Sequence, residues 1–320
     1  MNRVLITGVT GFIANHLARH LLQIGIDVRG TVRNEKRRTQ ILCQGMFSRT
    51  DQIFVHELTE KNDWTRTLDG CDTVYHLASL VHRTTPTSGE FQLNIAEATR
   101  HLAVQARKQG IRRFIFLGSL SVFGNDFSAE PIHEATPKKA VTPYGRAKLA
   151  AEESIKQVLG DSGTSWVIVR PPLVYGPDAP GNFHRLARLV KKLPCLPFGA
   201  ATQERDLIGI QNLVDFLALC GEHPEAANQD FNVCDPTGIT TKDLTSLMAQ
   251  GLKKGVVQIP VPRLLMRTLL IAVGQRETYE KLFETYRVDS SKAMQTLQWN
   301  PRSDVQEMIQ ESFLPQDDWP

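Results

Sequence analysis

The sequence lacks the features that mark a small stapled module or a nucleic-acid-binding protein. Its five cysteines form no closely spaced pair, so neither a disulfide scaffold nor a zinc module is indicated. The 37 basic and 34 acidic residues leave a formal charge of +3, too slight to indicate a nucleic-acid partner. With 41% hydrophobic and 22% charged residues over 320 positions, the chain is typical of a soluble globular protein of roughly two domains.

Long apolar runs are missing as well. Glycine and threonine interrupt the first residues, MNRVLITGVTGF, so no secretory segment is visible. No run approaches the roughly 20 apolar residues that span a bilayer. The longest candidate, residues 264–273, is short and contains Arg267, which favours a buried or interface helix over a membrane contact. We therefore expect a cytoplasmic protein with no membrane span.

The first half of the chain alternates short β-rich runs with segments of helical periodicity. We expect strands at residues 4–7, 28–32, 53–56, 73–77, 113–117 and 166–170, and helices at 12–23, 94–109 and 144–159. Repeated strand–helix–strand units of this kind predict an α/β fold with a doubly wound parallel sheet of Rossmann type.

The composition changes near Pro171 and Pro172, after which proline and glycine become more frequent and the alternation weakens. We place there the passage into a smaller C-terminal α/β domain. A later strand–helix–strand unit, at residues 207–210, 213–220 and 230–233, predicts a return to the first sheet. The expected first domain is 1–175 with 206–233, and the expected second domain is 176–205 with 234–320.

A glycine-rich loop joins the first predicted strand to the first predicted helix. Gly8 allows a tight turn, and Gly11 lets the backbone approach a pyrophosphate, which the positive end of the helix then holds. Ala14, at the third glycine position of this motif, is small enough for close helix packing. The loop therefore predicts a dinucleotide cofactor held by Gly8, Thr10, Gly11, Phe12 and Ile13.

Cations follow the second predicted strand, where an NAD enzyme usually carries an acidic residue. Arg33, Lys36 and Arg37 stand there without an aspartate. This pattern favours a ribose 2′-phosphate, and therefore NADP over NAD. A solvated basic loop is the alternative.

Tyr144 and Lys148 lie four residues apart, so on a helix both side chains face one cleft. A lysine cation and an oxidised nicotinamide both favour the phenolate of a tyrosine, whose ordinary pKa is about 10. We expect Tyr144 to exchange a proton with a substrate oxygen and Lys148 also to hold the nicotinamide ribose. Ser119, at the end of a strand, is expected to hydrogen-bond the reacting carbonyl.

These motifs together resemble the extended short-chain dehydrogenase/reductases over essentially the whole chain. The resemblance rests on TGVTGFIA at residues 7–14, DTVYHLAS at 72–79 and YGRAK at 144–148. Downstream, VRPPLVYGPDAPGNFHRLARLV from Val169 and RDLIGIQNLVD from Arg205 are similar to bacterial nucleotide-sugar epimerases and reductases. The nearest groups are the UDP-N-acetylquinovosamine 4-keto reductases and the UDP-N-acetylglucosamine 4-epimerases.

The resemblance also implies the remaining site residues. For the cofactor it adds Glu57, Leu58, Leu77, Ala78, Ser79, Asn94 and Pro171 to Tyr144 and Lys148. For a UDP-sugar substrate it implies Ser119, Ser121, Asn182, Arg205 and Arg276, with Arg205 shaped to bind two phosphate oxygens. His82 is a weaker candidate to line the substrate cleft, because it lies in the loop after the strand at 73–77. Asn182 is alternatively a helix cap and Arg276 an exposed helix residue.

Two positions depart from the family pattern, since Phe123 stands where relatives often have Tyr or Asn and Glu57 where an Asp is usual.

His16 and His20 have the spacing of a helical metal pair but lack the catalytic glutamate, so no metal is expected.

Three functions are compatible with these residues. The favoured one is an NADP-dependent 4-keto reductase or dehydrogenase acting at C4 of a UDP-linked N-acetyl sugar, in the synthesis of surface polysaccharide precursors. The alternative is a 4-epimerase of the UDP-N-acetylglucosamine or UDP-glucose type with a retained NAD, and a third is a non-catalytic redox-sensing regulator. Arg33 favours reduction, because a reductase must exchange its cofactor. The resemblance also implies a homodimer through the helices of Asn94 and Tyr144.

Overall fold

The fold is built on a seven-stranded sheet in which every pairing is parallel. The computed structural model describes residues 1–47, 49–78, 88–124 and 130–313. In the part of the chain so described, the strand order is β11-β6-β5-β4-β1-β2-β3. The strands are β1 (Arg3–Ile6), β2 (Asp27–Val32), β3 (Ile53–Val55), β4 (Thr73–His76), β5 (Arg113–Leu117), β6 (Ser165–Arg170) and β11 (Gln229–Asn232).

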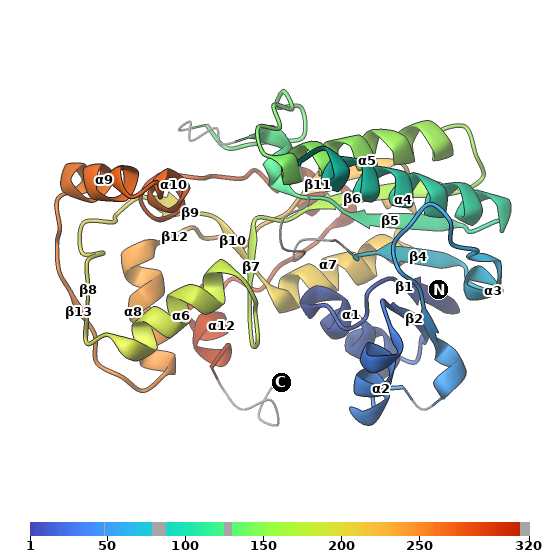
Figure 1. The fold of residues 1–320 in the computed structure, drawn as a ribbon, viewed down its shortest axis with the longest axis horizontal. Coiled ribbons are helices and arrows are strands. Elements are labelled where there is room, and N and C mark those ends of the chain that lie inside the picture. The colour runs from blue at the N-terminus through green and yellow to red at the C-terminus, as the bar shows by residue number, and fades with distance from the viewer. Residues whose placement is uncertain (48, 79–87, 125–129, 314–320) are drawn as a thin grey trace.

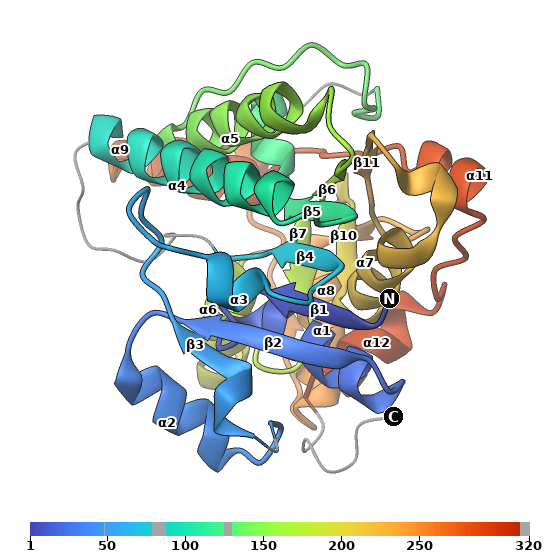
Figure 2. The same cartoon turned by 90° about the vertical axis from the view of Figure 1, so that its right-hand side faces the viewer.

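Helices cover both faces of this sheet, which confirms the predicted doubly wound α/β fold (Figures 1 and 2). One face carries α4 (Ser88–Lys108) and α5 (Pro143–Leu159). The opposite face carries α1 (Phe12–Gln23), α2 (Glu35–Cys43) and α7 (Ile210–Glu222), while the short α3 (Thr65–Leu68) precedes β4. Because α1 and α4 leave β1 and β4 toward opposite faces, the sheet has a switch point between these two strands.

Two predictions about the elements need correction. The helix expected from residue 94 begins at Ser88. The strand predicted at 207–210 forms β10 (Leu207–Gly209), which pairs with β7 (Leu173–Tyr175) in a separate two-stranded sheet. In the main sheet it is β11, and not β10, that pairs with β6. The predicted return to the first sheet is therefore confirmed for β11 and wrong for β10.

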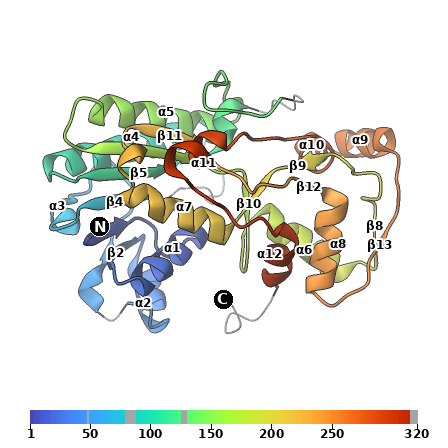
Figure 3. The same ribbon diagram turned by 180° about the vertical axis from the view of Figure 1, so that it is seen from behind.

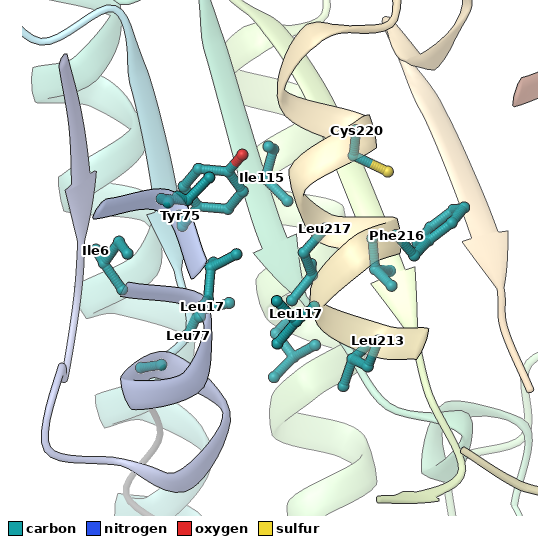
Figure 4. Close-up of a cluster of buried hydrophobic side chains, with 14 of the residues drawn as sticks. Ile6, Leu17, Tyr75, Leu77, Ile115, Leu117, Leu213, Phe216, Leu217 and Cys220 are labelled. Carbon is teal, nitrogen blue, oxygen red and sulfur yellow. The ribbon is translucent and has the colours of Figure 1, made fainter. Parts of the chain in front are cut away.

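One hydrophobic cluster joins α7 to the sheet (Figure 4). Leu213, Phe216, Leu217 and Cys220 recur at helical spacing, so they form one apolar face, and all four are fully buried. Figure 4 shows this face against side chains of the sheet, among them Ile115 and Leu117. The contact fixes α7 beneath the ends of β5 and β6.

The C-terminal part packs around a second hydrophobic cluster, which includes Phe183, Met248 and Phe283. Its helices are α6 (Asn182–Lys192), α8 (Thr241–Gly251), α9 (Arg263–Ala272), α10 (Arg276–Phe283) and α12 (Val305–Glu311). Its short strands pair as β8 (Cys195–Leu196) with β13 (Val257–Gln258), and β9 (Glu204–Arg205) with β12 (Ile239–Thr240). Between α10 and α12, α11 (Ser291–Leu297) returns to the main sheet, as Figure 3 shows.

The segment 264–273 was expected to form a buried or interface helix, and the buried alternative is wrong. None of the residues of α9 is buried. Only one stripe of it, with Met266 and Leu270, packs against the second cluster, because α9 lies outside α10 at the end of the molecule. Within the described residues, no helix is both long and apolar enough to cross a membrane.

Truncation of Leu217 to alanine should destabilise the protein by about 2–5 kcal/mol, because it removes buried methyl groups and leaves a cavity under the sheet. Urea denaturation followed by circular dichroism measures the change. Leu264→Ala is the control, since Leu264 is 70% exposed and its truncation should cost less than about 0.5 kcal/mol. Equal losses in the two variants would contradict the packing described for α7.

Candidate functional site

The loops after β1 and β4 meet at the switch point of the sheet. Gly8 has a φ of +72°, and a Cβ there would stand 3.0 Å from the Cβ of Ala78, so only glycine fits. The amide of Gly8 donates to Thr31 Oγ1 over 3.1 Å. Thr7 Oγ1 accepts hydrogen bonds from the amides of Leu77, at 3.1 Å, and Ala78, at 3.0 Å. Thr7, which the sequence did not single out, therefore fastens the two loops together.

The glycine loop leads into an uncapped helix end. Gly11 is the N-cap of α1, and no side chain caps this terminus. Its first amides therefore remain available for an anion, and the loop, with Thr10, Phe12 and Ile13, fits the diphosphate of a dinucleotide cofactor. The absence of side chains at Gly8 and Gly11 keeps the approach to these amides open.

The cations predicted to bind the adenosine end follow β2. Arg33 and Lys36 are exposed and make no hydrogen bond or ion pair with the rest of the described chain. Arg37 donates to Gln40 Oε1 over 2.7 Å, and Asn34 caps α2 through the amide of Arg37. The loop thus holds two unpaired cations beside the carboxyl end of β2.

The remaining predicted cofactor residues follow the carboxyl ends of neighbouring strands. Glu57 and Leu58 follow β3, Leu77 and Ala78 follow β4, and the buried Pro171 follows β6. All five therefore share the edge of the sheet that carries the glycine loop.

Three predicted positions fall where the structure gives no side-chain description. Ser79 and His82 lie outside the described residues. Asn94 lies in α4, and its side chain also lies outside what is described.

Tyr144 and Lys148 occupy the first turns of α5, where Thr142 caps the helix by accepting a hydrogen bond from Gly145. Lys148 is only 2% exposed, and its Nζ donates to the carbonyl of Leu117 over 2.8 Å. The same Nζ lies 5.9 Å from the ring centroid of Tyr144. The lysine therefore links the end of β5 to the predicted proton-transfer group.

Burial lowers the pKa of Lys148 to about 8, although the nearby Glu152 favours the ammonium form. The ammonium is accordingly the main form below about pH 8. It has the charge and the position needed to stabilise a tyrosine phenolate nearby.

Ser119 follows β5 and caps the short helix η2 (Leu120–Phe123). Its Oγ accepts hydrogen bonds from the amide of Ser121, at 3.2 Å, and from Ser121 Oγ, at 2.9 Å. A Cβ on Gly145 would collide with the carbonyl oxygen of Ser121, so this glycine lets α5 pack directly on η2. The packing places the hydroxyls of Ser119 and Ser121 beside the first turn of α5, which carries Tyr144.

Arg205 contacts the end of α10. Its Nη1 donates to the carbonyls of Glu280 and Glu284, both at 2.9 Å, and its guanidinium carbon lies 5.4 Å from the ring centroid of Tyr286. Burial raises the pKa of Tyr286 to about 12, so its hydroxyl stays protonated and donates to the carbonyl of Leu120 over 3.4 Å. Tyr286 thereby connects Arg205 to η2.

Asn182 and Arg276 lie farther out on the surface. Asn182 is exposed at the first turn of α6, whose cap is Gly181, so the capping alternative for Asn182 is wrong. Arg276 is exposed on α10 and pairs with Glu280 over 2.9 Å. Among the described residues, neither makes a hydrogen bond to Ser119.

A buried ion cluster lies directly behind Lys148 and the segment that leads to Ser119. Arg170 binds both carboxylate oxygens of Glu152 at 2.8 Å and Asp230 at 2.7 Å. Glu152 is one turn beyond Lys148 on α5, and a Cβ on Gly118 would meet its Oε1 at 2.8 Å. The cluster therefore braces the backbone that leads into the Ser119 hydroxyl.

His76 contributes no base to the site. Its Nδ1 lies 2.9 Å from Thr7 Oγ1 and its Nε2 3.0 Å from Thr99 Oγ1. Burial, assisted by the charge of Lys148, lowers the pKa of His76 to about 3, so the ring stays neutral. No group of acidic, histidine and cysteine side chains among the described residues could hold a metal ion.

The exchange of Glu152 for glutamine should destabilise the fold by about 3–5 kcal/mol, because the buried Arg170 loses its bidentate partner and keeps only Asp230, a carboxylate that it shares with Lys156 and Lys292. Glu153→Gln is the matched control, since Glu153 is the next residue on α5 and is exposed. It should change the unfolding free energy by less than about 0.5 kcal/mol. Urea denaturation compares the two, and similar values would show that the ion cluster does not carry the stability assigned to it.

Comparison with known proteins identifies a family for this arrangement. A model of the NAD dependent epimerase/dehydratase family matches residues 4–234. The chain is 33% identical over 317 residues to a UDP-glucose 4-epimerase of Vibrio cholerae, covering 95% of this chain and 92% of the relative. It is 24% identical over 266 residues to N-acetyl-alpha-D-glucosaminyl-diphospho-ditrans,octacis-undecaprenol 4-epimerase of Escherichia coli O157:H7, covering 82% and 76%.

Solved structures share the fold. A UDP-glucuronic acid 4-epimerase of Bacillus cereus in complex with NAD superposes with a TM-score of 0.77 at 21% identity, over 97% of each chain. A UDP-glucose 4-epimerase of Thermotoga maritima with UDP-glucose gives 0.76 at 20% identity, again over 97% of each chain. The chain belongs to the NAD dependent epimerase/dehydratase family and is an enzyme of the extended short-chain dehydrogenase/reductase class.

Proposed function

We propose that this enzyme is a 4-epimerase of a UDP-linked sugar, with an N-acetylhexosamine as the expected sugar. The observation that carries the proposal is the joining of Tyr144, Lys148 and Ser119 at the end of β5, through the Lys148–Leu117 hydrogen bond and the packing of α5 on η2. The 33% identity to a UDP-glucose 4-epimerase over nearly the whole chain supports the epimerase over the reductase.

The proposed chemistry requires one group that takes and returns a proton and one group that hydrogen-bonds the C4 oxygen of the sugar. When bound, the nicotinamide cofactor supplies hydride transfer to and from C4 of the sugar. Tyr144, as the phenolate, takes the proton from the C4 hydroxyl and later returns it, while the ammonium of Lys148 stabilises the phenolate charge. The hydroxyl of Ser119 donates a hydrogen bond to the C4 oxygen as it becomes a carbonyl. Ser121 holds Ser119 in place.

Arg205 is the proposed anchor for the substrate diphosphate. Its Nη1 donates to the carbonyls of Glu280 and Glu284 at the end of α10, and these two hydrogen bonds fix the plane of the guanidinium. The guanidinium has further donors for phosphate oxygens. Asn182 and Arg276 remain weaker proposals for the same ligand, because neither is bonded to the Ser119 segment among the described residues. His82, which lies outside those residues, stays a prediction.

A second candidate is the 4-keto reductase, and the observation that favours it is the pair of unpaired cations, Arg33 and Lys36, after β2. A ribose 2′-phosphate would bind both, whereas the NAD of an epimerase needs neither. NADP as cofactor is therefore part of this second proposal. A homodimer through α4 and α5 and a cytoplasmic location remain predictions under either function.

The decisive experiment incubates the purified enzyme with UDP-N-acetylglucosamine or UDP-N-acetylgalactosamine without added cofactor. We expect interconversion of the two, measured by chromatography of the UDP-sugars, because a retained cofactor is regenerated in each cycle. Inertness with these sugars together with NADPH oxidation by a UDP-4-keto sugar would overturn the epimerase and support the reductase.

The same assay tests the catalytic assignment. Tyr144→Phe should reduce turnover at least about 100-fold, the lower range for loss of a general acid–base group. Cofactor binding, measured by calorimetry, should be retained, because the phenol is not part of the glycine loop. Turnover at the wild-type rate would remove Tyr144 from the proposed mechanism.

Cofactor choice is tested at Arg33. Under the reductase proposal, Arg33→Ser should weaken NADPH binding about tenfold, which corresponds to roughly 1.4 kcal/mol, and leave NADH binding unchanged. Arg38→Ser serves as the control, because Arg38 is already paired with Glu35 and the carbonyl of Thr50. If both variants bind NADPH as the wild type does, the basic loop is simply solvated and does not read a 2′-phosphate.

A further inference from the structure

Helix α9 carries an apolar face that no described part of the chain covers. Met266 and Leu270 point toward the second hydrophobic cluster and account for the contacts of this helix with it. The other apolar side chains are exposed: Leu264 by 70%, Leu265 by 49%, Leu269 by 55%, Ile271 by 43% and Val273 by 68%. A contiguous apolar surface of this kind marks an interaction site.

The exposed face is held in a fixed orientation. Leu265, Thr268, Leu269 and Ala272 recur at the spacing of one helical stripe, and this stripe lies away from Met266. At the other side, Arg263 donates to the carbonyl of Phe283 over 2.8 Å and lies 3.5 Å from the carboxylate of Glu284. α9 is thus fastened to α10 with its apolar stripe outward, at the outer end of the molecule (Figures 1 and 3).

The charged residues of α9 itself are basic, Arg263 and Arg267, with no aspartate or glutamate. Arg263 pairs with Glu284, and the acidic Glu277 and Glu280 of the neighbouring α10 are paired with Lys281 and Arg276. Arg267 is exposed and makes no ion pair within the described chain. An amphipathic helix with exposed leucines and flanking arginines has the composition of helices that lie in the surface of an anionic membrane.

We propose that α9 docks this enzyme on an anionic phospholipid bilayer. The helix lies along the membrane surface, with Leu264, Leu265 and Leu269 among the upper acyl chains and Arg267 against lipid phosphates. This proposal is independent of the sugar on which the enzyme acts. It also agrees with the length of α9, because ten residues reach only about 15 Å and cannot span a bilayer.

A second copy of the chain is the less suitable occupant of this face. One helix about 15 Å long and 10 Å wide offers far less than the roughly 800 Å² that each partner buries in a stable protein interface. A bilayer requires no complementary surface, since lipids adapt to the shape of the inserted side chains.

The test is co-sedimentation of the full-length enzyme with vesicles, either of pure phosphatidylcholine or with added phosphatidylglycerol. We expect binding to the anionic vesicles that weakens as sodium chloride is raised, because salt screens the arginine–phosphate attraction. The double variant Leu265→Glu/Leu269→Glu should bind at least tenfold more weakly. Absence of wild-type binding at low salt, or equal binding by the double variant, would overturn the proposal.

The control is Ile24→Glu, matched to the single variant Leu264→Glu because each adds one negative charge at an exposed apolar residue; Ile24 is 57% exposed at the end of α1. Ile24→Glu should bind vesicles as the wild type does, and a loss equal to that of Leu264→Glu would attribute binding to net charge alone and refute a role of α9. The single variant Leu264→Glu tests the same face with a smaller perturbation, and circular dichroism verifies folding. Sedimentation equilibrium without lipid completes the test, because an assembly that dissociates in the α9 variants would make the face a protein interface instead.

Discussion

The site depends on one buried hydrogen bond, from the ammonium of Lys148 to the carbonyl of Leu117. A charged amine loses its favourable hydration when it leaves water, and this cost appears as the lowered pKa of Lys148. The fold tolerates the cost because Glu152 stands one turn farther along α5. Glu152 is in turn neutralised by Arg170, which also binds Asp230 on the edge strand β11. The position of the Lys148 ammonium is therefore fixed by the carbonyl at the end of β5 and by the ion cluster that α5 forms with β6 and β11.

This arrangement explains why the end of β5 and the start of α5 behave as one unit. Gly145 has no side chain, so η2 packs on the first turn of α5, and Gly118 leaves room for the carboxylate of Glu152. Larger residues at either glycine would separate Ser119 from Tyr144. Gly118 and Gly145 thus matter because they allow the segments that carry Ser119 and Tyr144 to pack closely.

Much of this architecture could be predicted from the sequence because it depends on local patterns. The bounds of α1 were predicted to the residue, and the spacing of Tyr144 and Lys148 placed both on one helix face. Contacts between distant segments carry no such pattern: Arg205 meets Tyr286, and Thr7 meets Ala78, only after folding. Apolar periodicity also cannot tell which face of a helix is covered, which is why residues 264–273 were expected to form a buried or interface helix. The division into two domains remains a prediction.

The glycine loop has a consequence for how the cofactor is held. Gly8 lies against Ala78 and is bonded to Thr31, while Thr7 secures the loop after β4, so three backbone segments are already fixed to one another. A ligand that enters a preorganised cradle does not have to pay for ordering it, and the saved conformational entropy appears as affinity. A rigid cradle also has few open states through which a bound dinucleotide can leave. Slow release of a bound cofactor is thus the expected consequence of the hydrogen bonds that fix this loop.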